Sequence, residues 1–232
     1  MSLSDFLKDP HHSVARERML HMKATLDMKV AAATCGYQLH MTEPEIDNSG
    51  FDFIIAHRYD KIHIQNKSTV DGSGVYSWDF HPLLFQVPFL ERDISPIVDG
   101  YPVGGAEGAM GGALLHIVSE EAAKDGRLEV KYYYFDIFYI SAVEQGLWDS
   151  KRLGREEAKN ILRMIRDGNW SERISLPFRA FLPISSPAAI VAFRLHMPRS
   201  SNYISLGHNC PSGLEELWRA EIRHWLPQDK LA

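Results

Sequence analysis

The sequence predicts an α/β protein in which a mixed sheet is flanked by helices and is followed by C-terminal α/β elaborations. Two observations predict this class. A long helical segment near the N-terminus is followed by closely spaced strands, and further β-prone segments alternate with amphipathic helices later in the chain. The 232 residues are 45% hydrophobic and 24% charged, which is a globular composition with room for a sizeable core. Because no internal repeat and no obvious linker divides the chain, we expect residues 1–232 to form a single domain.

Residues 13–34 carry the periodicity of one long helix. Asp9-Pro10 is typical of a helix start, with Asp as the N-cap and Pro in the first position, and Gly36 marks the end. Apolar side chains recur at i, i+3 and i+4 along two lines, so more than half of the circumference is apolar. We expect the first line to be the buried stripe. The two lines are Met19, Met22, Leu26, Val30 and Ala33, and Leu20, Ala24, Met28 and Ala31.

Three strands are predicted after this helix, at 37–40, 51–56 and 61–67, and the short connection HRYD joins the last two as a hairpin. Tyr, Phe and Ile dominate 128–140, which we therefore expect to be strand throughout. The remaining predictions are strands at 114–118 and 188–195, amphipathic helices at 155–167 and 214–226, and a flexible glycine-rich loop at 100–112.

Asp52, Gln65 and Lys67 form the most informative constellation. Side chains alternate faces along a strand, so Gln65 and Lys67 project from the same side, and Asp52 lies on the adjacent strand of the hairpin. A carboxylate, an amide oxygen and an ammonium group brought together suit metal-assisted hydrolysis of a phosphodiester. Asp52 would bind a divalent cation, and the side-chain oxygen of Gln65 and the backbone carbonyl of Asn66 would add ligands. Lys67 would position or deprotonate water and stabilise charge on the phosphate.

This pattern resembles the PD-(D/E)XK nuclease superfamily, in which a helix with a Glu precedes a strand with an Asp and a strand that ends in (D/E)XK. The counterparts here are Asp52 in GFDFII and the run Gln65-Asn66-Lys67-Ser68-Thr69, over roughly residues 12–70. The run from Gln65 to Thr69 looks like the motif of a subset of the superfamily that has Gln in place of the acidic residue. The resemblance implies a restriction-endonuclease-like fold, Mg²⁺ or Mn²⁺ as cofactor, duplex DNA as substrate and, as is common in the family, a homodimer.

Two residues depart from the superfamily pattern. Phe51 stands before Asp52 where the motif has Pro, and Gln65 replaces a carboxylate, which removes one negative charge from the metal site. Glu17 is the best candidate to compensate, because it lies in line with the apolar residues of the second helix line, where a carboxylate needs a partner or a metal. Asp27 borders the same arc and is the alternative. The third choices lie in the loop before the Asp52 strand and are Glu45 and Asp47.

Other polar residues are weaker candidates. His63 shares a face with Gln65 and Lys67 and could transfer a proton beside the metal, although a polar residue of the strand face is the favoured interpretation. The glycine-rich loop is not a phosphate-binding P-loop, because it has no Gly-Lys-Ser/Thr. One helix carries a basic stripe that either contacts phosphates or, as we favour, is a solvated face: Arg155, Lys159, Arg163 and Arg166.

Composition bounds the environment of the protein. The formal net charge of -5 excludes attraction of nucleic acid by the whole surface but not by a local basic face. Two cysteines fit a reducing compartment. The N-terminus has no apolar region of a secretory signal, and the apolar runs are too short to span a bilayer, so we expect a soluble cytoplasmic protein without a membrane partner.

The sequence therefore predicts a Mg-dependent endodeoxyribonuclease of the restriction, defence or repair type. Gln65 favours the main alternative, which is a catalytically inactive nuclease-fold protein that binds nucleic acid or a protein partner. A third interpretation is a globular interaction protein in which Asp52 and Lys67 form only an ion pair.

Overall fold

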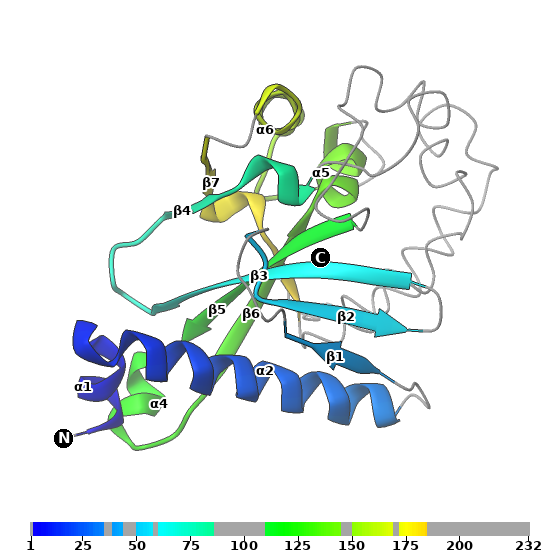
Figure 1. The fold of residues 1–232 in the computed structure, drawn as a ribbon. Coiled ribbons are helices and arrows are strands. Elements are labelled where there is room, and N and C mark those ends of the chain that lie inside the picture. Colours follow the sequence, from blue (N-terminus) through cyan, green and yellow to red (C-terminus); the bar gives the residue numbers. More distant parts are fainter. Residues whose placement is uncertain are drawn as a thin grey trace.

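Figure 1 shows the computed structural model of the chain, which describes residues 2–34, 39–43, 50–57, 60–85, 110–144, 150–168 and 172–184. A sheet of six strands in the order β1-β2-β3-β5-β6-β8 forms the centre of this part. β3 and β5 are parallel and the other neighbours are antiparallel, so the sheet is mixed and the predicted α/β class is confirmed. The strands are β1 (His40–Thr42), β2 (Phe53–His57), β3 (Asp60–Val70), β5 (Met110–Val118), β6 (Val130–Asp136) and β8 (Leu182–Ile184).

Helix α2 (Ser13–Thr34) covers one face of the sheet and has the bounds that the sequence predicted. Its buried line is the second of the two apolar lines, because Leu20, Ala24 and Met28 are buried. The expected buried stripe is wrong: Met22 and Leu26 are 63% and 59% exposed. Both lines have helical spacing, so periodicity alone does not choose between them. The buried line continues to Ala32, four residues after Met28.

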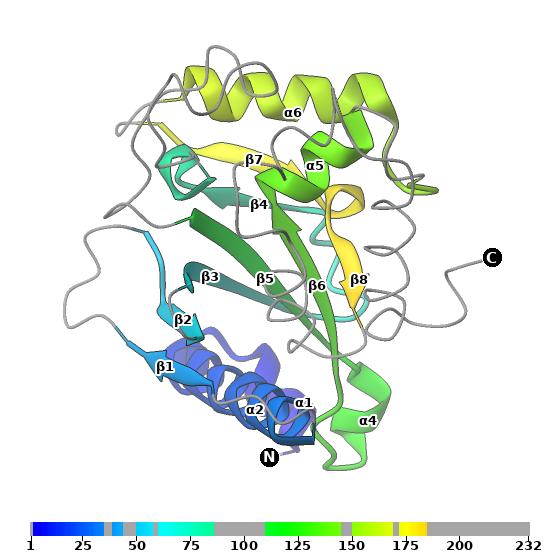
Figure 2. The ribbon, with the colours of Figure 1, turned by 90° about the vertical axis from the view of Figure 1, so that its right-hand side faces the viewer.

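The opposite face carries a second layer, which Figure 2 shows on the far side of the sheet from α2. β4 (Ser77–Phe80) and β7 (Ile174–Pro177) form a two-stranded sheet there, together with α5 (Ile137–Glu144) and α6 (Arg155–Asp167). α6 has the predicted bounds. Aromatic rings fill the space between the layers, with Phe80 against Phe85 and Phe135 against Phe181 at centroid distances of 5.7 and 5.6 Å. These two layers make the main core.

Two short helices, one of them at the N-terminus, were missed by the sequence prediction. Helix α1 (Leu3–Lys8) and the later α4 (Glu120–Lys124) are each too short to show helical periodicity. The predicted cap at Asp9 is confirmed, since its side chain accepts a hydrogen bond from the backbone N–H of His11 at 2.9 Å. It caps a 3₁₀ turn, Pro10–His12, that leads directly into α2.

The prediction of strand throughout 128–140 is wrong in its second half. β6 ends at Asp136 and the chain continues as helix α5 from Ile137. The buried Asp136 carboxylate accepts a hydrogen bond from the backbone N–H of Tyr139 at 2.7 Å, which is the geometry of a helix N-cap. Strand propensity of aromatic and β-branched residues reflects packing more than backbone preference, so a buried cap overrides it.

The predicted glycine-rich loop is also corrected at its end, because Gly111 and Gly112 lie inside β5. A Cβ at Gly111 would stand 1.9 Å from the backbone oxygen of Leu84, and one at Gly112 would stand 2.8 Å from the Tyr134 ring. Glycine here permits close packing and is not a sign of a loop. Some predictions concern residues outside the described part of the chain. They are the rest of the glycine-rich segment, Gly36, and the elements at 188–195 and 214–226. Of the helices described, none combines the length and the apolarity needed to cross a bilayer.

Candidate active site at the unpaired edge of β3

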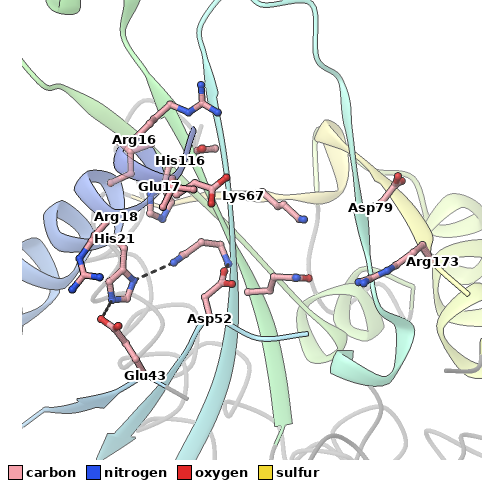
Figure 3. Close-up of a pocket in the computed structure, with 15 residues that line it drawn as sticks. Arg16, Glu17, Arg18, His21, Glu43, Asp52, Lys67, Asp79, His116 and Arg173 are labelled. Atoms are coloured by element: carbon pink, nitrogen blue, oxygen red, sulfur yellow. Dashed lines mark hydrogen bonds and ion pairs between the residues drawn. The ribbon is translucent and has the colours of Figure 1, made fainter. Parts of the chain in front are cut away.

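The candidate site lies at a strand edge that the sheet leaves open. β2 pairs with β3 as far as Ile64, whereas β5 accompanies the other side of β3 up to Val70. Residues 65–70 therefore have one edge with no strand beside it in the described part of the chain. A pocket of about 760 Å³ opens along this edge, and Figure 3 shows its lining. The four residues predicted to be catalytic all line this pocket: Glu17, Asp52, Gln65 and Lys67.

β3 sends alternate side chains to the two walls of the pocket. Asn66 points to α2, where its amide Nδ2 lies 3.3 Å from Nδ1 of His21. Lys67 points the other way, and its Nζ lies 5.6 Å from the centre of the Phe80 ring on β4. Gln65 shares the face of Lys67 by strand alternation, as the sequence predicted. The pocket thus wraps around the strand edge and reaches both faces of the sheet.

Asp52 lies in a bend just before β2, at the strand edge rather than on either face. Its backbone N–H donates to the carbonyl of Ile64 at 2.8 Å, and its carboxylate accepts from the backbone N–H of Asn66 at 2.5 Å. In a strand the N–H and C=O groups of one residue point to the same side. The backbone carbonyl of Asn66 therefore points to the edge where the Asp52 carboxylate lies.

Gln65 brings a buried acceptor to the same place. The residue is 9% exposed, and its Oε1 atom has no hydrogen-bond partner among the described residues. Buried polar atoms are nearly always paired, so this amide, on a residue that lines the pocket, is a candidate partner for a ligand, ion or water. The O and N atoms of the amide can exchange places by a flip, so either end can face such a ligand.

Of the helical carboxylates, Glu17 lies at the pocket and Asp27 does not. Glu17 is exposed on the first turns of α2, and Figure 3 shows it reaching toward β3. Asp27 is engaged elsewhere, with both oxygens 2.6 Å from Nζ of Lys23 and one of them 2.6 Å from the Tyr132 hydroxyl. Burial, and then the hydrogen bond to Asp27, raise the pKa of Tyr132 above its usual range. Glu45 and Asp47 lie outside the described residues.

The structure adds site residues that the sequence analysis missed. On the α2 wall, Nε2 of His21 lies 3.2 Å from the carboxylate of Glu43. His116 on β5 is buried, and neither ring nitrogen has a hydrogen-bond partner in the described structure. The far wall holds Asp79 and Arg173. His21 was accessible to sequence reasoning, since it follows Glu17 by four residues and thus shares its helix face.

His63 does not join the site. It is buried, stacks on the Phe51 ring at a centroid distance of 4.1 Å, and is not part of the pocket lining. The basic stripe of α6 is likewise separate from the pocket, because α6 lies beyond β4 and β7 in the second layer (Figure 2). The basic residues that do line the pocket are Arg16, Arg18, Lys67 and Arg173.

The residues present fit a hard cation by donor chemistry. Carboxylate, amide and backbone carbonyl oxygens are the ligands that Mg²⁺ accepts, and Asp52, Gln65 and Asn66 supply one of each at the strand edge. Within the described ranges no three His, Cys, Asp or Glu side chains gather closely enough to hold a metal by themselves. Carbonyl ligands would therefore have to complete the coordination.

The amino-acid sequence matches no family model and no curated protein.

Proposed function

We propose that this protein is a metal-dependent endodeoxyribonuclease that hydrolyses phosphodiester bonds of duplex DNA and has a restriction-endonuclease-like fold. The observation that carries the proposal is the edge of β3 that has no neighbouring strand in the described part of the chain, where Asp52, Gln65 and Lys67 line one pocket and bring a carboxylate, a side-chain amide and an ammonium group together. The order of elements supports it as well. A helix with Glu17 precedes the hairpin that bears Asp52 and then Gln65-Asn66-Lys67.

Asp52, Gln65 and the backbone carbonyl of Asn66 would hold Mg²⁺ or Mn²⁺, with Glu17 as the second carboxylate in reach of the same pocket. Such an ion would neutralise charge on the phosphate and lower the pKa of water. The hydrogen bond from the Asn66 N–H holds the Asp52 carboxylate in place before any ion binds. This preorganisation means that little side-chain entropy is lost on binding.

Lys67 and the arginines would bind the DNA backbone. The Lys67 ammonium lies over the Phe80 ring, which limits its freedom while its charge faces the pocket. Arg16 is held by its hydrogen bond to the carbonyl of Leu7 at 2.7 Å, at the mouth formed by α2. Arg173 stands on the opposite wall. Cations on both walls suit a polyanion whose phosphate backbone enters the pocket.

One observation favours a second function, a nuclease-fold protein that binds DNA or a protein partner without cutting. Gln65 stands where a carboxylate would give the ion a second negative charge at the strand edge, and a neutral ligand weakens a hard-cation site. In this alternative the same basic walls would bind DNA, but the site would not hydrolyse the phosphodiester bond.

A plasmid-nicking assay with and without Mg²⁺ or Mn²⁺ tests the proposal. We expect wild-type protein to nick DNA only with metal, and Asp52→Asn to lose at least a hundredfold in rate, because the main charged ligand is gone. DNA affinity in the same variant should change little, since phosphate contacts come from the distributed basic residues.

Asp79→Asn is the matched control. Asp79 lines the same pocket, carries the same chemistry and is exposed on β4, but it stands on the far wall. The proposal expects this variant to keep its nicking activity. Wild-type protein that binds DNA but cuts no substrate under either metal would favour the binding function, and full activity in Asp52→Asn would refute the site.

A further inference from the structure

Asn66 is connected to helix α2 by a chain of side chains that ends in solvent. Its Nδ2 lies 3.3 Å from Nδ1 of His21, and Nε2 of His21 lies 3.2 Å from the carboxylate of Glu43. The chain begins at the strand edge, because the backbone N–H of Asn66 donates to Asp52. Glu43, His21 and Asn66 therefore form one continuous path to the carboxylate proposed to bind the metal.

The partners of His21 fix its tautomer. Nε2 faces a carboxylate, which only accepts, so this nitrogen carries the hydrogen and donates to Glu43. With the hydrogen on Nε2, Nδ1 is the acceptor for the amide Nδ2 of Asn66. The ring also meets the edge of Phe53 on β2 at a centroid distance of 4.9 Å, which restrains its orientation. A histidine with both nitrogens engaged and a packed ring can hold a neighbour in place.

Asn66 needs such a restraint, because β2 does not extend to its position. Pairing between the two strands ends at Ile64, so residue 66 has no strand neighbour on the Asp52 side among the residues described. The orientation of its backbone decides where its carbonyl points and where its N–H holds Asp52. β5 holds β3 from the other side as far as Val70, and the contact of the Asn66 side chain with His21 on α2 adds a restraint on the Asp52 side.

We propose that His21 is a positioning residue of the metal site, which acts through the side chain of Asn66 and is itself oriented by Glu43. The proposal rests on the function proposed above. Residues that orient metal ligands typically change metal affinity ten- to a hundredfold when they are removed. The effect of His21 should therefore appear in metal binding and turnover, and not in DNA affinity.

Two near-matched substitutions separate the contacts of the ring. In His21→Asn the amide oxygen takes the place of Nδ1, so the contact with Asn66 is kept and that with Glu43 is lost. In His21→Gln the amide nitrogen takes the place of Nε2, so the contact with Glu43 is kept and that with Asn66 is lost. Mn²⁺ titration calorimetry and plasmid nicking of both variants are compared with wild-type protein, and thermal unfolding checks that each is folded.

We expect His21→Gln to bind Mn²⁺ about tenfold more weakly and to nick more slowly at saturating metal, with an unchanged KM for DNA, while His21→Asn stays within about threefold of wild-type protein. Glu43→Ala removes the same contact that His21→Asn removes, at a side chain that is 62% exposed, so it should likewise stay within about threefold of wild-type protein. Equal Mn²⁺ affinity in wild-type protein and His21→Gln would overturn the positioning role. Failure of wild-type protein to bind Mn²⁺ at all would instead overturn the proposed function, so the two failures are distinguishable.

Discussion

At the scale of single residues, His116 is the most strongly perturbed group of the pocket. It is 1% exposed, its ring meets Tyr132 edge-on at 5.4 Å, and neither nitrogen has a described hydrogen-bond partner. Burial lowers its pKa to about 3, with a further lowering from His21 and an opposing effect of Asp27. The folded protein therefore keeps this ring neutral well below the pH at which a histidine in water becomes protonated.

This burial makes stability depend on pH in a definite direction. The unfolded chain protonates His116 near pH 6.5, whereas the folded chain does so only near 3, so stability is complete above 6.5 and falls as the pH drops through that window. Between pH 6.5 and 5 the loss should be about 2 kcal/mol. Urea unfolding of wild-type protein and His116→Leu at both pH values measures it. Equal pH dependence in the two proteins would show that His116 is protonated in the folded state.

At the scale of elements, sequence reasoning succeeded where one local signal dominated. The bounds of α2 and α6 are those predicted, and a hairpin forms where predicted, although β2 (Phe53–His57) and β3 (Asp60–Val70) differ in their bounds from the predicted strands at 51–56 and 61–67. Long helical periodicity and a tight connection between β-prone runs are local properties. It failed at Ile137 and Gly111. The change from β6 to α5 depends on a buried cap, and the place of Gly111 in β5 depends on the approach of the Leu84 backbone. Both are tertiary facts.

Gly111 gives a sharp test of the β5 packing. Gly111→Ala would place a Cβ 1.9 Å from the backbone oxygen of Leu84, which cannot rotate away, so we expect a loss of about 3 kcal/mol in the free energy of unfolding. Gly154→Ala is the control, because nothing lies within 4 Å of its Cβ position at the start of α6. It should cost at most about 1 kcal/mol. Denaturant unfolding of Gly111→Ala and Gly154→Ala measures the two losses. Equal unfolding midpoints of the two variants would contradict the packing at β5.

At the scale of the whole molecule, the pocket combines two layers that are far apart in the sequence. Its α2 wall and the edge of β3 come from the first 70 residues, where helical periodicity and the hairpin pattern predict the site residues Glu17, Asp52, Gln65 and Lys67. The far wall comes from β4 and from the residue just before β7. Asp79 and Arg173 could not be predicted, because only the folding of the second layer over the sheet brings them to the pocket.

The two basic walls predict how DNA binding responds to salt. Arg18→Gln on α2 and Arg173→Gln on the far wall should each weaken binding similarly for all sequences and reduce the slope of log affinity against log salt by about 1. Arg163→Gln on the exposed face of α6 is the control and should leave the slope unchanged. Fluorescence anisotropy with a labelled duplex over a salt series measures the slopes. A larger change for Arg163 than for the wall arginines would place the DNA on α6.

The measurement that tests the central claim most directly is Mn²⁺ titration calorimetry of wild-type protein and Gln65→Glu, beside plasmid nicking by the same samples. If Gln65 lies at the metal, the nearly isosteric carboxylate adds one negative charge to the site, and Mn²⁺ affinity should rise about tenfold or more while nicking is kept or increased. Tighter binding without nicking in either protein would favour the binding function over the enzyme. Unchanged Mn²⁺ affinity would show that Gln65 is not at a metal, and would contradict the site proposed at the edge of β3.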